Sequence, residues 1–159
     1  MRLAEHTGTT RGTLSQFAFA EVYAAIVDLD QLYPDFGNWF WNKVVPEIGN
    51  SRRIFTEWSD GQLAGVVIAK AEGDERKLCT VWIAPNFKKQ GLGRRLMSEA
   101  KVWLGTETPL ISVPHQRLSE FQPIFDQWGF SLTQTLRSYY RYGETEYVFN
   151  GTLPLLHQA

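Results

Sequence analysis

The order of strand-like and helix-like segments between residues 53 and 104 constrains the fold of this chain most strongly. Residues 53–58, 62–71 and 77–84 are largely apolar, and Ser59-Asp60-Gly61 between the first two is a turn typical of a β-hairpin. These segments predict three successive strands in a meander. From residue 91 to 104 apolar residues recur at helical spacing instead, with residues 94, 95, 98, 99 and 101 expected on the exposed face and Gly105 as the cap. The chain is therefore expected to be a mixed α/β protein.

A short basic turn, Lys88-Lys89-Gln90-Gly91-Leu92-Gly93-Arg94-Arg95, separates the last of these strands from the helix. The first N–H groups of a helix have no partner within it, and the helix dipole attracts anions to this end. Glycine lets the backbone approach a ligand closely. A strand, a glycine turn and a helix in this order indicate a phosphate site. The turn lacks the P-loop pattern, and Leu96 stands where a dinucleotide-binding turn needs its third glycine.

The flanking segments complete the predicted architecture. Residues 14–20 fit either an edge strand or the start of a helix, and residues 1–13, rich in Thr and Gly, are expected to form a loosely held arm. We expect residues 14–159 to form a single domain. The other predicted elements are helices over 21–32 and 35–48, a strand over 110–113, a helix that begins near Ser119, and a closing hairpin from 132–141 and 146–150.

Composition limits the classes of function. The 159 residues carry a net charge of −1, which argues against general nucleic-acid binding. One cysteine, Cys79, excludes an internal disulfide, and with only three histidines we expect no metal site. The sequence shows neither a signal peptide nor an apolar run of membrane-spanning length, so we expect a cytoplasmic protein without a membrane partner.

The element order resembles that of the GCN5-related N-acetyltransferase (GNAT) family, over roughly residues 21–151. The most specific segment is Val81-Trp82-Ile83-Ala84-Pro85-Asn86-Phe87 with the basic turn and Leu96 after it. It matches the family pattern of an aliphatic strand end, Pro, an aromatic, a basic pair and [R/Q]-G-x-G-x-x-Leu, although Lys88 replaces the usual Arg or Gln. Gly129-Phe130 matches a second hallmark. The resemblance implies a central mixed, mostly antiparallel sheet of six to seven strands flanked by about four helices.

The same resemblance implies acetyl-CoA, or another acyl-CoA, as cofactor and a primary amine as acceptor. Backbone N–H groups of Gln90, Gly91, Leu92, Gly93 and Arg94 would bind the pyrophosphate, and Lys88, Lys89 and Arg95 would add charge. The strand edge formed by Val81, Trp82 and Ile83 would pair with the pantetheine amides. The amine would attack the thioester directly in a ternary complex, with a backbone N–H beside Ile83 stabilising the oxyanion.

The usual side chains of the chemistry are absent. Phe125 stands where the family often has the tyrosine that protonates the thiolate, and Leu118 stands where an asparagine often contacts coenzyme A. Four residues are substitute candidates: Tyr140 as acid, His115 as base, Ser119 as a cofactor contact and Glu57 as base. Each also has a structural interpretation: cross-strand packing for Tyr140, a loop position for His115, a helix N-cap for Ser119 and a solvated strand carboxylate for Glu57.

Two other functions stay open at this stage. One is a toxin that acetylates aminoacyl-tRNA, for which residues 43, 52 and 53 and the basic turn would have to supply a basic surface. The other is a non-catalytic acyl-CoA-binding module that regulates a partner, which the residues at 118 and 125 favour. A homodimer is also left open, because the sequence does not define the oligomeric state.

Overall fold

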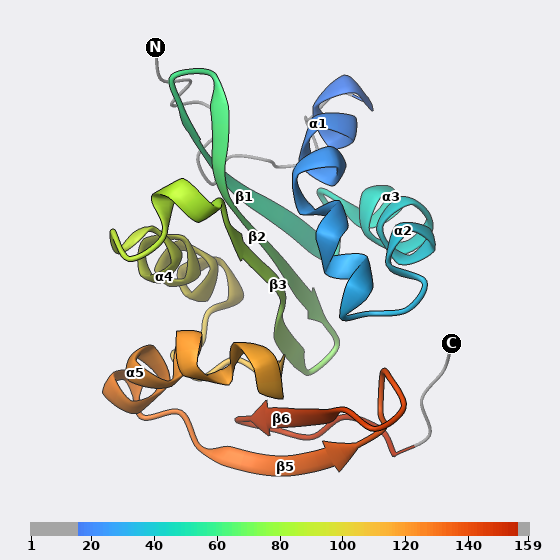
Figure 1. Ribbon diagram of the computed structural model, residues 1–159, viewed down its shortest axis with the longest axis vertical. Coiled ribbons are helices and arrows are strands. Elements are labelled where there is room, and N and C mark those ends of the chain that lie inside the picture. The colour runs from blue at the N-terminus through green and yellow to red at the C-terminus, as the bar shows by residue number, and fades with distance from the viewer. Residues whose placement is uncertain (1–15, 156–159) are drawn as a thin grey trace.

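The computed structural model describes residues 16–155, and in this range six strands form two three-stranded antiparallel sheets (Figure 1). The first sheet has the order β1-β2-β3 and comprises β1 (Arg52–Ser59), β2 (Gln62–Glu72) and β3 (Glu75–Ile83). The second has the order β4-β6-β5 and comprises β4 (Ile111–Pro114), β5 (Leu132–Arg137) and β6 (Thr145–Phe149). The predicted meander is confirmed, but in the described residues the strands are divided between two three-stranded sheets, so neither sheet has the six to seven strands that were expected. The arm predicted over residues 1–13 lies outside the described residues.

The two sheets are joined at one end by a short parallel contact between β3 and β4. Lys77 and Leu110 form a parallel bridge. The N–H of Leu78 donates to the carbonyl of Leu110 at 2.9 Å, and the N–H of Leu110 donates to the carbonyl of Arg76 at 2.8 Å. Beyond this junction β4 pairs with β6 rather than with β3. Taken together across this bridge, the strands have the mixed, mostly antiparallel arrangement that was expected, and β3 and β4 diverge beyond the bridge.

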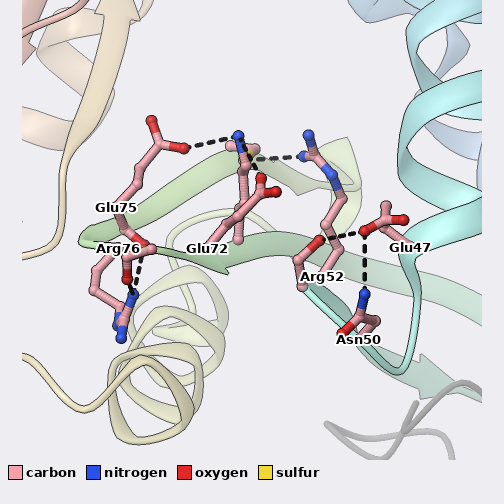
Figure 2. Close-up of polar contacts among 10 residues, drawn as sticks. Glu47, Asn50, Arg52, Glu72, Glu75 and Arg76 are labelled. Carbon is pink, nitrogen blue, oxygen red and sulfur yellow. Dashed lines mark hydrogen bonds and ion pairs between the residues drawn. The ribbon is translucent and has the colours of Figure 1, made fainter.

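Polar contacts hold the β2–β3 hairpin beside this junction (Figure 2). Nη1 of Arg76 donates to the carbonyl oxygens of Gly73 and Glu75, each at 2.8 Å. Nζ of Lys70 lies 2.8 Å from Oε1 of Glu75. Because Arg76 also supplies the carbonyl that Leu110 binds, these contacts fix the closed end of the opening between the sheets.

Helices cover both faces of the first sheet (Figure 1). One face packs against α1 (Gln16–Ile26) with η2 (Val27–Gln31) and against a second helical segment made of α2 (Phe36–Trp39), η3 (Phe40–Val44) and α3 (Val45–Glu47). The other face packs against α4 (Leu92–Leu104), which follows η4 (Pro85–Phe87). The last helix, α5 (Leu118–Trp128), follows η5 (His115–Arg117). The segment left undecided at residues 14–20 is thus helical from Gln16.

Strand β2 separates two apolar cores, as its sequence predicts. Val66 and Ile68 face α1 and α2, whereas Val67 and Ala69 face α4. Such two-sided burial is typical of a central strand. In the described part of the chain, no helix combines the length and apolar character needed to cross a bilayer.

One predicted exposed residue of α4 is buried. Only 6% of Lys101 is exposed, its Nζ lies 3.6 Å from the ring centroid of Trp128, and Oε1 of Glu107 is 3.3 Å away. The prediction was wrong because α5 packs beside α4, and the helical periodicity of α4 alone carries no information about that neighbour.

Candidate functional site

The basic turn between β3 and α4 exposes the helix N-terminus. Lys89 and Gly91 adopt left-handed backbone conformations, with φ of 63° and 80°, and Gly91 is the N-cap residue. The N–H of Arg95 donates to the carbonyl of Gly91 at 3.1 Å, so the N–H groups of residues 92–94 have no partner within the helix. No side chain caps this end, and residues 88–91 are exposed. The turn can therefore present several N–H groups and the helix dipole to an anion.

Two cations of the turn connect it to α5. Nζ of Lys88 lies 3.6 Å from Oε2 of Glu120. The guanidinium of Arg94 lies over the ring of Trp128, 5.7 Å from its centroid. These contacts place α5 beside the turn. They also mean that Lys88 and Arg94 share their charges with groups of α5.

Glu57 lies beneath α4. Its side chain is buried, 3% of the residue being exposed, and Oε1 is 3.1 Å from Nη2 of Arg95. Glu57 pairs with Gly65 on β2, whose α-carbon faces Leu92 and Leu96 of α4. The interpretation as a solvated carboxylate is therefore wrong. Glu57 anchors the first turns of α4 and lines neither of the cavities described below.

The outer edge of β3 faces the opening between the sheets. The carbonyl of Val81 accepts a hydrogen bond from Nη2 of Arg117 at 2.9 Å, so its peptide group points away from β2. Peptide groups alternate in direction along a strand, and Ile83 therefore faces the same way. Trp82 is paired with Val66 on β2. Val81 and Ile83 thus offer the backbone groups at this edge.

A first cavity lies where β3 and β4 diverge. Residues 78–81 of β3 and 111–113 of β4 form its walls, and Tyr33 and Arg117 also line it. It begins directly beyond the junction at Lys77.

A second cavity lies next to the first and contains a buried carboxyl group. It is lined by Leu32, Pro114, Gln116, Tyr140, Arg141, Glu144 and Glu146. Glu146 on β6 is 4% exposed and faces Pro114 across the β4–β6 pairing. Ser112 on β4 and Tyr33, which follows η2, are its hydrogen-bonding neighbours. Residues far apart in the sequence therefore meet at one carboxyl group.

The surroundings of Glu146 change its proton affinity. Loss of hydration on burial raises the pKa of this carboxyl to about 7, although hydrogen bonds from Ser112 and Tyr33 and the positive charges of Lys77 and Arg117 act in the opposite direction. Among the described residues, Oε2 has no hydrogen-bond partner. The sequence analysis did not find Glu146. Its one signal is its position on the same strand face as the buried Val148.

Tyr140 lies beside this carboxyl group. Its ring meets that of Tyr33 edge to face, with centroids 5.1 Å apart, so it does not pack across the strands as expected. Burial, with the nearby Glu146 charge, raises the pKa of Tyr140 well above its usual value. The hydroxyl therefore stays protonated at neutral pH and can donate a hydrogen bond. Strand β5 ends at Arg137, so Tyr140 belongs to a loop.

The other two candidates line neither cavity. His115 is exposed in η5, and its Nδ1 lies 3.0 Å from the hydroxyl oxygen of Tyr147. Ser119 is exposed in the first turn of α5, whose N-cap residue is Arg117, so the N-cap interpretation was wrong. Phe125, at the position of the usual acid, is fully buried among aromatic rings, including that of Phe149. That position is part of the core here.

Comparison with protein families gives the class of this protein. The family model described as the Acetyltransferase (GNAT) family matches residues 17–111, more than half of the chain. The chain belongs to this family, as the basic turn and the element order indicated. No curated protein matches it in sequence.

Solved structures share the fold. The ribosomal-protein-S18-alanine N-acetyltransferase from Escherichia coli has a TM-score of 0.66 at 21% identity, over 86% of this chain and 88% of that one. The PaiA N-acetyltransferase from Thermoplasma acidophilum, in complex with coenzyme A, has a TM-score of 0.62 at 15% identity, over 85% and 94%. An aminoglycoside 6′-N-acetyltransferase complexed with coenzyme A has a TM-score of 0.64 at 11% identity, over 85% of this chain and 90% of that one.

Proposed function

We propose that this protein transfers an acetyl group from acetyl-CoA to a primary amine, by direct attack in a ternary complex. The observation that carries the proposal is one continuous path along β3. The exposed N-terminus of α4 lies at one end of it, the strand edge at Val81 and Ile83 follows, and the first cavity lies at the other end. An elongated ligand with phosphates at one end and a thioester at the other fits such a path.

Backbone groups supply most of the cofactor contacts in this proposal. N–H groups from Gln90 to Arg94 bind the pyrophosphate, with charge from Lys88, Lys89 and Arg95. Val81 and Ile83 pair with the pantetheine amides as a neighbouring strand would, and Trp82 supports that edge. The coenzyme A present in the PaiA and aminoglycoside acetyltransferase structures supports this choice of ligand. Binding then requires Arg117 to release the Val81 carbonyl.

The chemistry needs few side chains. Holding amine and thioester together supplies much of the rate, and an N–H beside Ile83 would stabilise the oxyanion. Of the four sequence candidates, Tyr140 lines the second cavity, so we propose it as the acid for the thiolate. His115, Ser119 and Glu57 are weaker proposals because they line neither cavity. We further propose that residues 14–159 act as one domain in the cytoplasm.

Gly93 provides a direct test of the cofactor site. A Cβ added here would lie 3.5 Å from Cγ1 of Ile83, which is an ordinary contact, so a side chain fits. Gly93→Glu places a negative charge at the helix start, and Gly93→Gln is its neutral control of equal size. We expect calorimetry to show at least tenfold weaker acetyl-CoA binding for Gly93→Glu than for Gly93→Gln. Equal affinities for both variants and the wild type would refute the proposed site.

Thiol release with a panel of amines separates catalysis from binding. We expect coenzyme A to be released at a rate that depends on the amine. Tight acetyl-CoA binding without release for any amine would favour the non-catalytic module instead.

A further inference from the structure

The carboxyl group of Glu146 and the first cavity have two neighbouring residues in common. Ser112 and Tyr33 line the first cavity and are also the hydrogen-bonding neighbours of Glu146. Glu146 itself lines the second cavity. A group bound to this carboxyl in the second cavity would therefore lie next to the place where the thioester carbonyl is expected.

One oxygen of the Glu146 carboxyl group lacks a hydrogen-bond donor. Oε2 of Glu146 is buried and has no hydrogen-bond partner in the described part of the chain. A buried carboxylate oxygen without a donor costs free energy, and an ammonium group would supply one. The groups around it are Lys77 on β3, Arg117 on η5, Tyr33 after η2, and Tyr140, Arg141 and Glu144 in the loop before β6.

We propose that Glu146 binds the ammonium group of the acceptor and removes its proton, and that the second cavity is the acceptor site. This inference rests on the proposed function and adds the charge state of its substrate, an amine that arrives protonated. Leu32 and Pro114 provide apolar surface for the carbon next to the nitrogen. Glu146 is thus a catalytic residue that none of the sequence motifs contains.

The step balances as follows. The ammonium R–NH₃⁺ gives one proton to the Glu146 carboxylate and becomes R–NH₂. The nitrogen lone pair forms the C–N bond to the thioester carbon, the C–S bond breaks, and its electron pair leaves with sulfur. The second N–H proton goes to the thiolate, through Tyr140 or water, and Glu146 later returns its proton to solvent.

The proton affinity of Glu146 agrees with this role. Burial raises its pKa to about 7. A carboxyl that titrates near the working pH is a stronger base than an ordinary one and is still ionised in part of the molecules. Ser112 and Tyr33 hold the carboxyl in position by hydrogen bonding.

The variant Glu146→Gln tests the proposal, because it keeps the shape and the hydrogen bonding but cannot accept a proton. Probes are acetyl-CoA with n-propylamine, with spermidine and with a lysine-containing peptide. We expect kcat to fall on the order of 10²- to 10⁴-fold, with unchanged calorimetric affinity for acetyl-CoA. The rise of wild-type kcat/KM with pH around 7 should disappear. Glu146→Asp should restore part of the rate.

Glu99→Gln is the matched control. Glu99 on α4 also has a pKa raised by burial, and it lines neither cavity. Its rate and pH profile should equal those of the wild type. If the wild type acetylates an amine and Glu146→Gln does so with the same rate and pH profile, the role of Glu146 is refuted while the proposed function stands. If the folded wild type binds acetyl-CoA but acetylates none of the amines, both are refuted.

Discussion

The raised pKa of Glu146 makes the stability of the fold depend on pH. Its pKa is about 7 in the folded protein against an ordinary value of 4.5. Between these values the folded state binds more protons than the unfolded state, so this group makes stability fall as pH rises from about 4.5 through 7. Glu146→Gln removes that dependence and should be more stable than the wild type at pH 8, by up to about 3 kcal/mol.

Urea denaturation at pH 5 and pH 8 measures this effect. The stability difference between variant and wild type should grow in favour of the variant at the higher pH. A difference that is the same at both pH values would show that the carboxyl is not buried as described.

The exposed helix start at the basic turn was easier to predict from the sequence than the cluster of side chains around Glu146. The basic turn is local: glycine spacing, charge and the start of a helix all lie within eight residues. The Glu146 cluster needs residues 33, 112 and 146 at one place, which only the strand register and the path of the chain determine. Glu57 was misjudged for the same reason, because its partner Arg95 belongs to a different element.

At the scale of elements, the approach of α4 to the first sheet depends on Gly65 in β2. A Cβ at this position would lie 2.9 Å from Cδ1 of Leu96 and 3.2 Å from Cδ2 of Leu92. The added methyl group therefore forces the side chain of Leu96 to shift within a packed core, and we expect Gly65→Ala to lose roughly 1–3 kcal/mol in stability. Because Leu92 and Leu96 belong to the helix start that forms part of the proposed cofactor site, acetyl-CoA affinity should fall as well.

Thermal denaturation and calorimetry check this prediction, with Gly93→Ala as control. The added methyl group at residue 93 meets only ordinary contacts, so its stability should stay close to that of the wild type. If Gly65→Ala melts at the same temperature as the wild type, the packing between β2 and α4 can accommodate the added methyl group.

The elements themselves were well predicted because their signals are local. Alternation and helical spacing located β1 to β3, α4 and α5, and Gly105 ends α4 as expected. The sequence did not predict which element covers the outer surface of each helix. Lys101 looked exposed on its own helix, but Trp128 of α5 covers it.

At the scale of the molecule, two backbone hydrogen bonds of Leu110 join the sheets. Leu110→Pro removes the N–H that binds the carbonyl of Arg76, whereas Leu110→Ala keeps it. We expect the proline variant to unfold at a lower urea concentration than the alanine variant. Its free energy of unfolding should be lower by about 1–3 kcal/mol. It should also bind acetyl-CoA more weakly, because the junction sets the width of the first cavity. Equal free energies of unfolding and equal acetyl-CoA affinities for the two variants would mean that the sheets hold together without this hydrogen bond.

The division of the sheet was the part of the architecture least visible in the sequence. Strand β4 has four residues, and its partner β6 begins only at Thr145. A pairing over that distance leaves no local pattern. The resemblance to the family predicted a mixed sheet, whereas the place where the strands diverge became clear only from the structure.

The contact between Arg117 and the Val81 carbonyl also shields an open strand edge. An unpaired strand edge is a template on which another chain can add a strand. Here the guanidinium occupies the acceptor at the middle of that edge, and a foreign strand would have to displace a charged donor that Glu120 also holds, at 3.1 Å from Nε. A soluble ligand with its own phosphate anchor can make that exchange, but a neighbouring polypeptide lacks the anchor. The side chain that a ligand would have to displace therefore also makes this edge a poorer template for another chain.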